Sequence, residues 1–153
     1  MSRCEKAIVT VLCMVYEGNK ILLQDRVKKD WRGFTFPGGH VEKEESFVQA
    51  VIREIYEETG LTIRETKLCG VKQFQTDEDE RYIVLLFKTD KFEGTLTSSD
   101  EGEMVWIDRN SLNDYKLVND FMELLKVFDS DHYSEFMYER NRSDDDNCFI
   151  RLY

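Results

Sequence analysis

The stretch GHVEKEESFVQAVIREIYEETGL, residues 39–61, joins a glycine turn to a helical pattern that is dense in carboxylates. Its apolar residues recur three and four positions apart, which predicts a helix over 46–59 with one buried side. Ser46 and Gln49 fit a capping box at the start of this helix, and Gly60 suits its C-terminal end. The sequence therefore predicts a turn followed by a half-buried helix.

Three glutamates lie on one side of this predicted helix. Glu54, Glu57 and Glu58 fall within an arc of about 100°, where like charges repel by roughly a few tenths of a kcal/mol per pair. One interpretation is a solvated charged face. The other is a cradle for hard divalent cations, because Mg²⁺ and Mn²⁺ prefer oxygen ligands. Gly38 and Gly39, which let the backbone turn sharply and approach a ligand, favour the cradle.

The same stretch satisfies a longer pattern, GX5EX7REUXEEXGU, in which U is a bulky aliphatic residue. The fixed positions are Gly39, Glu45, Arg53, Glu54, Ile55, Glu57, Glu58, Gly60 and Leu61. This pattern resembles the signature of the Nudix hydrolase family. The resemblance implies an α/β (α+β) fold, the Nudix-type α/β/α sandwich with a mixed β-sheet between helices.

The resemblance also implies roles for the acidic residues. Glu57 and Glu58 would be metal ligands together with the carbonyl of Gly38, and Glu54 would be a further ligand or the base that activates water. The implied cofactor is Mg²⁺, with Mn²⁺ as the alternative. Hydrolysis of a phosphate linkage needs positive charge on the phosphate oxygens. An acidic protein obtains this charge from metal ions.

Arg53 is expected to offset part of the carboxylate crowding and to orient a neighbouring carboxylate by a bidentate contact. We therefore count it among the catalytic residues; the alternative is a surface ion pair of little energetic worth. The resemblance implies that Glu45 has a structural role or lies just outside the residues that bind the metal. It also implies that Gly39 and Gly60 are structural positions of the motif.

A second group of acids precedes Trp106 in SSDEGEMVWID, residues 98–108. Many family members have a catalytic or metal-binding glutamate in the loop before such a tryptophan. The resemblance therefore implies this role for Glu101, with Glu103 as the second choice. The alternative is a solvated acidic loop.

KLVNDFMELLK, residues 116–126, resembles a segment of the oxidised-purine nucleoside triphosphatases of the MutT/MutX type. Asn119 and Asp120 occupy the positions that bind the purine edge in that group, and both side chains offer polar atoms for such a contact. The alternative is N-capping of a second helix, which the apolar spacing predicts over 118–128.

WRGF, residues 31–34, resembles the loop that lines the same pocket. Trp31 and Phe34 could stack on a base or could anchor the loop. Arg32, also assigned to this pocket, stands where the mammalian enzyme has an amide side chain, so the selectivity for oxidised guanine could differ. Arg26 could reach a substrate phosphate.

The expected reaction is Mg²⁺-dependent hydrolysis of a nucleoside diphosphate linkage. The favoured substrate is a purine (deoxy)nucleoside triphosphate such as 8-oxo-dGTP, cleaved to the monophosphate and pyrophosphate. ADP-ribose, a dinucleoside polyphosphate and a nucleotide sugar are the alternatives within the family. The intact motif argues against a non-catalytic nucleotide-binding domain, and the acidic charge argues against an RNA-end pyrophosphohydrolase.

The length and the charge of the chain limit the number of domains and the kinds of partner that we expect. The 153 residues predict a single domain, with a core over about 5–128 and a C-terminal extension, 129–153, of unassigned role. The net charge of −10 weighs against nucleic acid polymers, so the expected partner is a small-molecule nucleotide. Monomer and homodimer both stay open. The N-terminal apolar run is too short to cross a membrane and lacks a secretory cleavage site, which favours a cytoplasmic location.

Outside the motif, alternating and β-branched segments predict strands, and the first two form a hairpin across EGNK. Strands interrupted by two helices indicate a sandwich. The predicted strands are 7–16, 21–27, 68–75, 82–88 and 103–108.

Overall fold

The structure is a computed structural model, and it describes residues 3–27, 30–140 and 147–153. The expected strands and helices are joined by shorter elements that the sequence patterns do not reveal. In chain order the elements are β1 (Ala7–Glu17), β2 (Lys20–Arg26), β3 (Gly33–Thr35), β4 (Gly38–His40), α1 (Phe47–Thr59), β5 (Leu61–Arg64), β6 (Lys67–Gln75), β7 (Arg81–Thr89), β8 (Lys91–Gly94), β9 (Gly102–Asp108), the 3₁₀ helix η1 (Arg109–Asp114), α2 (Phe121–Asp129), β10 (Glu135–Arg140) and β11 (Cys148–Leu152).

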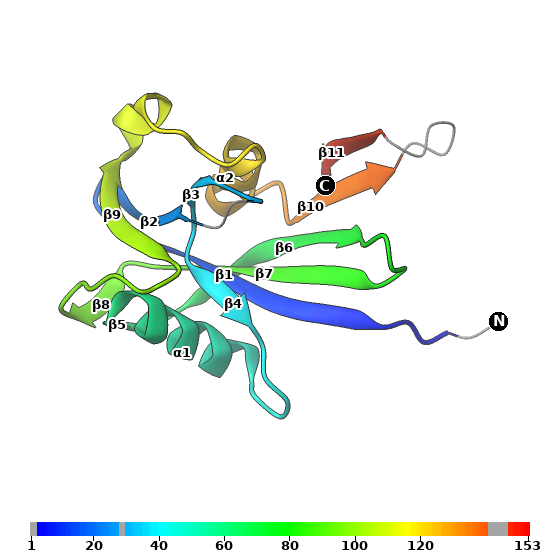
Figure 1. Cartoon of the computed structure of the whole chain (residues 1–153), viewed down its shortest axis with the longest axis horizontal. Coiled ribbons are helices and arrows are strands. Elements are labelled where there is room, and N and C mark those ends of the chain that lie inside the picture. The colour runs from blue at the N-terminus through cyan, green and yellow to red at the C-terminus, as the bar shows by residue number, and fades with distance from the viewer. Residues whose placement is uncertain (1–2, 28–29, 141–146) are drawn as a thin grey trace.

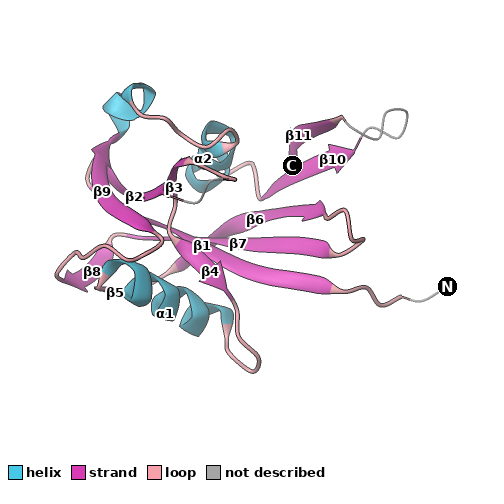
Figure 2. Ribbon diagram, in the orientation of Figure 1, coloured by secondary structure: helices cyan, strands magenta, loops and turns pink. Residues whose placement is uncertain are grey.

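A mixed β-sheet forms the middle layer, with α1 against one face and α2 against the other (Figure 1). The sheet runs in the order β11-β10-β6-β7-β1-β2-β3, with β4 paired to β1 and β9 paired to β2, while β5 and β8 form a separate ribbon (Figure 2). The β1–β7 and β6–β10 pairs are parallel and the other pairs are antiparallel. The expected α/β/α sandwich with a mixed sheet is confirmed.

Strand β1 connects the two halves of the sheet. It pairs with β7 along most of its length and turns through Gly18 into β2, so the expected hairpin is confirmed. Gly18 has a φ of 57°, the left-handed conformation that a two-residue hairpin turn needs. Over Thr10 to Leu12, β1 also pairs with β4. The glycine loop is therefore held against the middle of the sheet.

The alternation of side chains along the strands produces two cores. On the α1 side, Val11 of β1 packs in one buried cluster with Ile55 of the helix. On the α2 side, Met14 belongs to a second cluster that contains Phe36 and Phe121, whose rings stack with centroids 4.8 Å apart. Both faces of the sheet are thus covered, which fixes the two helices relative to the strands between them.

Helix α1 has the capping that its sequence predicts. The side chain of Ser46 accepts a hydrogen bond from the Gln49 N–H, and the Gln49 side chain accepts one from the Ser46 N–H. At the other end Gly60, with a φ of 75°, donates to the Tyr56 carbonyl. The capping box and the glycine C-cap are both confirmed.

Helix α2 begins at Phe121 instead of at residue 118, so the predicted start was wrong. Val118 donates its N–H to the carbonyl of Phe34, and Phe34 donates its own N–H to the carbonyl of Lys116. These bonds keep the segment before the helix extended beside β3. A long-range contact therefore overrides the local helical spacing.

The C-terminal extension, whose role the sequence leaves unassigned, enlarges the sheet. β10 pairs with β6, and β11 pairs with β10 at the edge. Residues 141–146, in the middle of this extension, lie outside the described residues.

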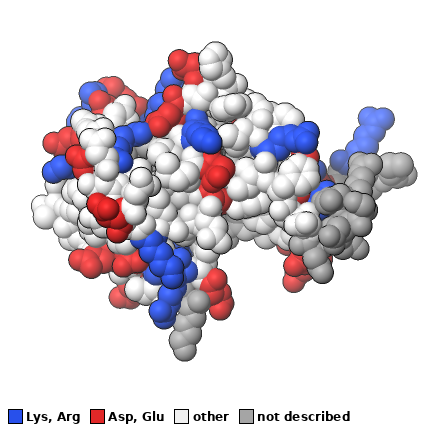
Figure 3. Space-filling model, turned by 90° about the horizontal axis from the view of Figure 1, so that it is seen from above, with Lys and Arg blue, Asp and Glu red and all other residues white. Residues whose placement is uncertain are grey.

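Basic and acidic side chains lie in small interspersed groups on the face seen in Figure 3. In the described parts of the chain, no helix has the length and apolar character needed to cross a membrane.

Candidate active site

The glycine loop and α1 meet at β4. The N–H of Gly38 donates to the carboxylate of Glu58 at 3.0 Å. A Cβ on Gly38 would lie 2.0 Å from the carbonyl oxygen of Val11, and one on Gly39 would lie 2.4 Å from the carboxylate of Glu54. Glycine at both positions therefore lets the strand and the two glutamates approach so closely.

Arg53 lies between the carboxylates of α1 and those of the preceding loop. Its Nε and Nη2 donate to the two oxygens of Glu45 at 2.7 and 3.0 Å, and Nη1 donates to Glu54 and Glu57 at 3.0 and 3.2 Å. Nη2 also donates to the His40 carbonyl. The guanidinium lowers the pKa of Glu45 to about 2. Arg53 thus orients three carboxylates, of which Glu57 is 56% exposed and points outward.

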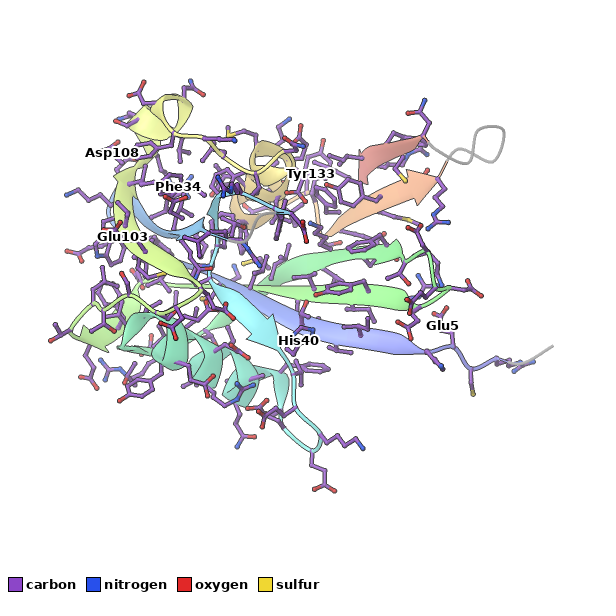
Figure 4. All side chains as sticks on the ribbon, in the orientation of Figure 1. Glu5, Phe34, His40, Glu103, Asp108 and Tyr133 are labelled. Atoms are coloured by element: carbon purple, nitrogen blue, oxygen red, sulfur yellow. The ribbon has the colours of Figure 1, made fainter. Side chains whose placement is uncertain are left out.

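Glu101 reaches the motif from the loop before β9. Its carboxyl group lies beside that of Glu58, and its proximity raises the pKa of Glu58 and of Glu54. Glu103 is exposed on β9, and Figure 4 shows it well apart from His40 on β4. Of the two acids considered for this loop, Glu101 is the one that faces the motif.

Burial disfavours the charged forms of two motif glutamates. Glu58 is 5% exposed, and burial together with the adjacent Glu101 raises its pKa to about 9. Burial also raises the pKa of Glu54, although the nearby Arg53 opposes this shift. Such carboxyl groups ionise readily when a cation lies among them.

A cavity of about 650 Å³ extends from these glutamates along the sheet. The strand register places Lys72, Val84, Thr10 and His40 in one row from β6 to β4. With about 4.8 Å between neighbouring strands, this row is about 14 Å long. We call the two ends of the cavity the carboxylate end (Glu54, Glu58 and Glu101) and the lysine end (Lys72, Asp120 and Tyr138).

A buried ion pair lies at the lysine end. Lys72 donates to Oδ2 of Asp120, and the hydroxyl of Tyr138 donates to the same oxygen at 2.9 Å. The Lys72 and Asp120 side chains are only 9% and 5% exposed. Asp120 precedes α2, yet its side chain makes no capping hydrogen bond there, so capping does not account for it. Burial and the charge of Asp120 raise the pKa of Tyr138, which keeps its hydroxyl protonated.

Aromatic rings line the cavity beside this ion pair. Phe74 and Tyr82 stack with centroids 5.0 Å apart, and Phe74 meets Tyr138 edge-on at 5.9 Å. Trp31 also lines the cavity, with the guanidinium of Arg26 4.8 Å from its ring centroid. Nε of Arg26 is buried and has no hydrogen-bond partner among the described residues. The lysine end therefore combines flat apolar surfaces with a few polar groups.

The structure brings only part of the expected substrate-binding set to this cavity. Phe34 lies on β3 (Figure 4), where its ring meets that of Tyr115 edge-on at 5.2 Å instead of lining the cavity. Arg32 is exposed and also lies outside the lining. The expected residues that do line the cavity are Arg26, Trp31, Asn119 and Asp120.

Sequence reasoning missed several of the lining residues, among them Lys72, Phe74, Tyr82 and Tyr138 beside the ion pair. Alternation along a strand places Lys72 and Phe74 on one face, but both faces of this sheet are covered, so the pattern does not tell which face borders a cavity. Tyr138 belongs to β10, a strand that the sequence patterns did not predict.

The family model of the NUDIX domain matches residues 6–128. The chain belongs to the Nudix family. Nudix hydrolases act on nucleoside diphosphate derivatives and generally use divalent metal cations, and this chain is such an enzyme. The matched region ends before β10, so Tyr138 lies beyond the part that identifies the family.

Named relatives within the Nudix family differ in substrate. The chain is 37% identical to an ADP-ribose pyrophosphatase of Methanocaldococcus jannaschii, over 78% of this chain and 72% of that protein. It is 38% identical to an oxidized purine nucleoside triphosphate hydrolase of Danio rerio, over 51% of this chain and 49% of that protein. A MutT protein of Bacillus halodurans has the same fold, with a TM-score of 0.76 at 24% identity over 95% of this chain and 97% of that one.

The carboxylate end has the donor chemistry that a hard divalent cation needs. Carboxylate oxygens of Glu54, Glu58 and Glu101 line the cavity together, and burial raises the pKa of the first two. Within the described residues, no three acidic, Cys or His side chains already enclose a position for a metal ion. Arg53 donates hydrogen bonds to both Glu54 and Glu57. The carboxylate donors at this end therefore have the chemistry that a hard divalent cation would need.

Proposed function

We propose that this Nudix hydrolase cleaves purine (deoxy)nucleoside triphosphates, with 8-oxo-dGTP as the favoured substrate, to the monophosphate and pyrophosphate. The observation that carries the proposal is one cavity with carboxylates at one end and a buried polar and aromatic set at the other. A nucleotide has the same division, since its sugar separates charged phosphates from a flat polar base. The biological role would be to remove oxidised guanine nucleotides from the cytoplasmic pool.

In this proposal carboxylates of the chain would hold Mg²⁺ and would activate water. The residues that would bind Mg²⁺ are Glu54, Glu57, Glu58 and the carbonyl of Gly38. When bound, Mg²⁺ supplies positive charge for the phosphate oxygens and lowers the pKa of a water. Glu54 or Glu101 accepts the proton of the attacking water, since both carboxylates border the cavity. Arg53 keeps the glutamates of the motif oriented.

The other end of the cavity would bind the nucleoside. Asp120 and Asn119 present polar atoms to the base, and Trp31 offers a face on which it can stack. Arg26, which lines the cavity beside Trp31, would donate from its guanidinium group to a phosphate oxygen. The relative from Danio rerio, which is named for oxidized purine nucleoside triphosphates, supports this class of substrate.

ADP-ribose is a second candidate substrate. It is favoured by the relative from Methanocaldococcus jannaschii, because that match covers more of both chains than the match to the Danio rerio protein. ADP-ribose carries a second ribose in place of the terminal phosphate, so its products differ: hydrolysis releases two monophosphates and no pyrophosphate.

A turnover panel separates these candidates. We would compare 8-oxo-dGTP, dGTP, dATP, ADP-ribose and diadenosine tetraphosphate in Mg²⁺, measuring pyrophosphate and phosphate separately, with Glu58→Gln as the control for contaminating activity. A kcat/KM preference of about a hundredfold for 8-oxo-dGTP, roughly 2.7 kcal/mol, is expected. A preference for ADP-ribose would replace the proposed substrate and keep the Nudix chemistry.

A further inference from the structure

Lys72 is a buried ammonium group to which the Nudix motif gives no role. Its Nζ lies 5.3 Å from the ring centroids of both Phe136 and Tyr138, and its carboxylate partner is Asp120. Taking an ion pair out of water carries a large desolvation cost, which an apolar side chain at this position would avoid. An ion pair retained in the wall of a cavity is therefore a candidate for ligand recognition.

The hydrogen bonds of the ion pair leave a defined set of polar atoms for a ligand. Oδ2 of Asp120 already accepts from Lys72 and from Tyr138, so Oδ1 is the remaining acceptor of that carboxylate. The ammonium group of Lys72 has three hydrogens, of which Asp120 takes one. Because both side chains line the cavity, they present a donor directly beside an acceptor.

We propose that Lys72 is a specificity-determining residue that donates to a ring carbonyl oxygen of the substrate base, while Asp120 accepts from the neighbouring ring N–H. The proposal rests on the proposed function, since the carboxylate end must hold the phosphates of the same ligand. Guanine and hypoxanthine present a carbonyl beside an N–H. Adenine presents an amino donor beside a ring nitrogen acceptor, so its amino group would oppose the ammonium of Lys72 and leave a buried donor unpaired.

Tyr138 is the positioning residue of this arrangement. It acts through Asp120, because its hydroxyl donates to Oδ2 and thereby turns the carboxylate relative to the cavity. Tyr138 lies on β10, which pairs with β6 at Lys72 through Phe136. The C-terminal extension therefore contributes to selection of the base, although it lies outside the region that identifies the family.

Equilibrium binding of nucleoside monophosphates tests the proposal without depending on turnover. We would measure the affinity of the full chain for dGMP, dIMP, dAMP and the 2,6-diaminopurine analogue, which differs from guanine where Lys72 is proposed to bind. Wild type should bind dGMP and dIMP at least about tenfold more tightly than their amino counterparts, the effect of one hydrogen bond to a charged group. Lys72→Met should remove this preference and keep the affinity for dAMP within about threefold.

Lys88→Met is the matched control. Lys88 is a half-buried lysine on the neighbouring strand, it donates to the Phe128 carbonyl at 2.8 Å, and it is not part of the cavity lining. This variant should keep the wild-type preference. Tyr138→Phe removes one hydroxyl only, and it should reduce the preference by about threefold while leaving the melting temperature nearly unchanged.

The outcomes separate this proposal from the proposed function. Equal affinities for the four nucleotides in wild type, or a preference that survives in Lys72→Met, overturn the role of Lys72. If Lys72→Met does not fold, an unchanged preference in Tyr138→Phe overturns the proposed arrangement. A dGMP preference that depends on Lys72, found in a chain that hydrolyses no triphosphate, supports the role of Lys72 and overturns the proposed function alone.

Discussion

The two ends of the cavity are built in different ways. The carboxylate end comes mainly from one turn and one helix within residues 38–58, with Glu101 added from a distant loop. The lysine end is assembled from three separate elements, since Lys72 and Tyr138 lie 48 and 18 positions from Asp120 in the chain. A contiguous segment keeps reactive groups in fixed geometry, whereas dispersed segments can change recognition without disturbing it. Mutations at the two ends should therefore have separable effects.

The largest effect is expected for Glu58→Gln at the carboxylate end. An amide keeps the shape of the side chain and can still accept from the Gly38 N–H, but it is a poor ligand for a hard cation. We expect kcat to fall by about a thousandfold, roughly 4 kcal/mol of transition-state stabilisation, with the circular dichroism spectrum unchanged. A variant with a near wild-type rate would show that this end does not carry the chemistry.

The next largest effect on kcat is expected for Glu101, and Glu103, two positions further along the chain, serves as its comparison. Glu101→Gln should lower kcat by about thirtyfold, roughly 2 kcal/mol, because Glu101 faces Glu58 across the carboxylate end. Glu103→Gln should stay within about twofold of wild type, because Glu103 is exposed on β9. The measurement is the steady-state kcat of both variants in saturating Mg²⁺. A reversed order would move the catalytic role from Glu101 to Glu103.

A pair of glycine substitutions separates geometry from stability. In Gly39→Ala the new Cβ would meet the Glu54 carboxylate at 2.4 Å, so we expect kcat to fall about tenfold as that side chain is displaced. In Gly18→Ala nothing lies within 4 Å, but the φ of 57° is strained for alanine. That variant should lose about 1 kcal/mol of unfolding free energy and keep its kcat. Thermal melts and kinetics of both variants make the test. A loss of kcat in Gly18→Ala, or an unchanged kcat in Gly39→Ala, would contradict the prediction.

The same contrast explains how much of the site can be predicted from the sequence. The glutamates of α1 are predictable because the helical period places them on one side, and because the caps Ser46 and Gly60 define where the helix begins and ends. The partner of this helix, the turn at Gly38 and Gly39, lies immediately before it in the chain. Local rules therefore place these glutamates beside the glycine turn, whereas their expected roles, and that of Glu101, came from the family resemblance.

The lysine end cannot be derived from local rules. Its geometry depends on the parallel pairing of β6 with β10, and strand alternation cannot reveal which strands become neighbours. The extended segment at Val118 shows the same limit, because its hydrogen bond to Phe34 replaces the first turn of the expected helix. Similarity to relatives indicated Asp120, whereas its partners Lys72 and Tyr138 emerge only when the sheet is assembled.

The smallest effect on kinetics is expected in residues 31–34, where Trp31 precedes β3 and Phe34 lies on it. Trp31 is 42% exposed, lines the cavity and lies over Arg26, whereas Phe34 packs against Tyr115 away from the cavity. Trp31→Ala should raise KM by about fivefold, near 1 kcal/mol of lost stacking, and leave the melting temperature almost unchanged. Phe34→Ala should instead cost about 2 kcal/mol of unfolding free energy, since it removes a half-buried ring, and keep KM.

Kinetics and thermal melts of these two variants would therefore distinguish a residue that binds substrate, Trp31, from one that stabilises the fold, Phe34. A rise of KM in Phe34→Ala without loss of stability would mean that the loop rearranges when substrate binds and brings Phe34 to the base. In that case the lysine end would extend onto β3, and recognition would draw on a fourth element of the chain.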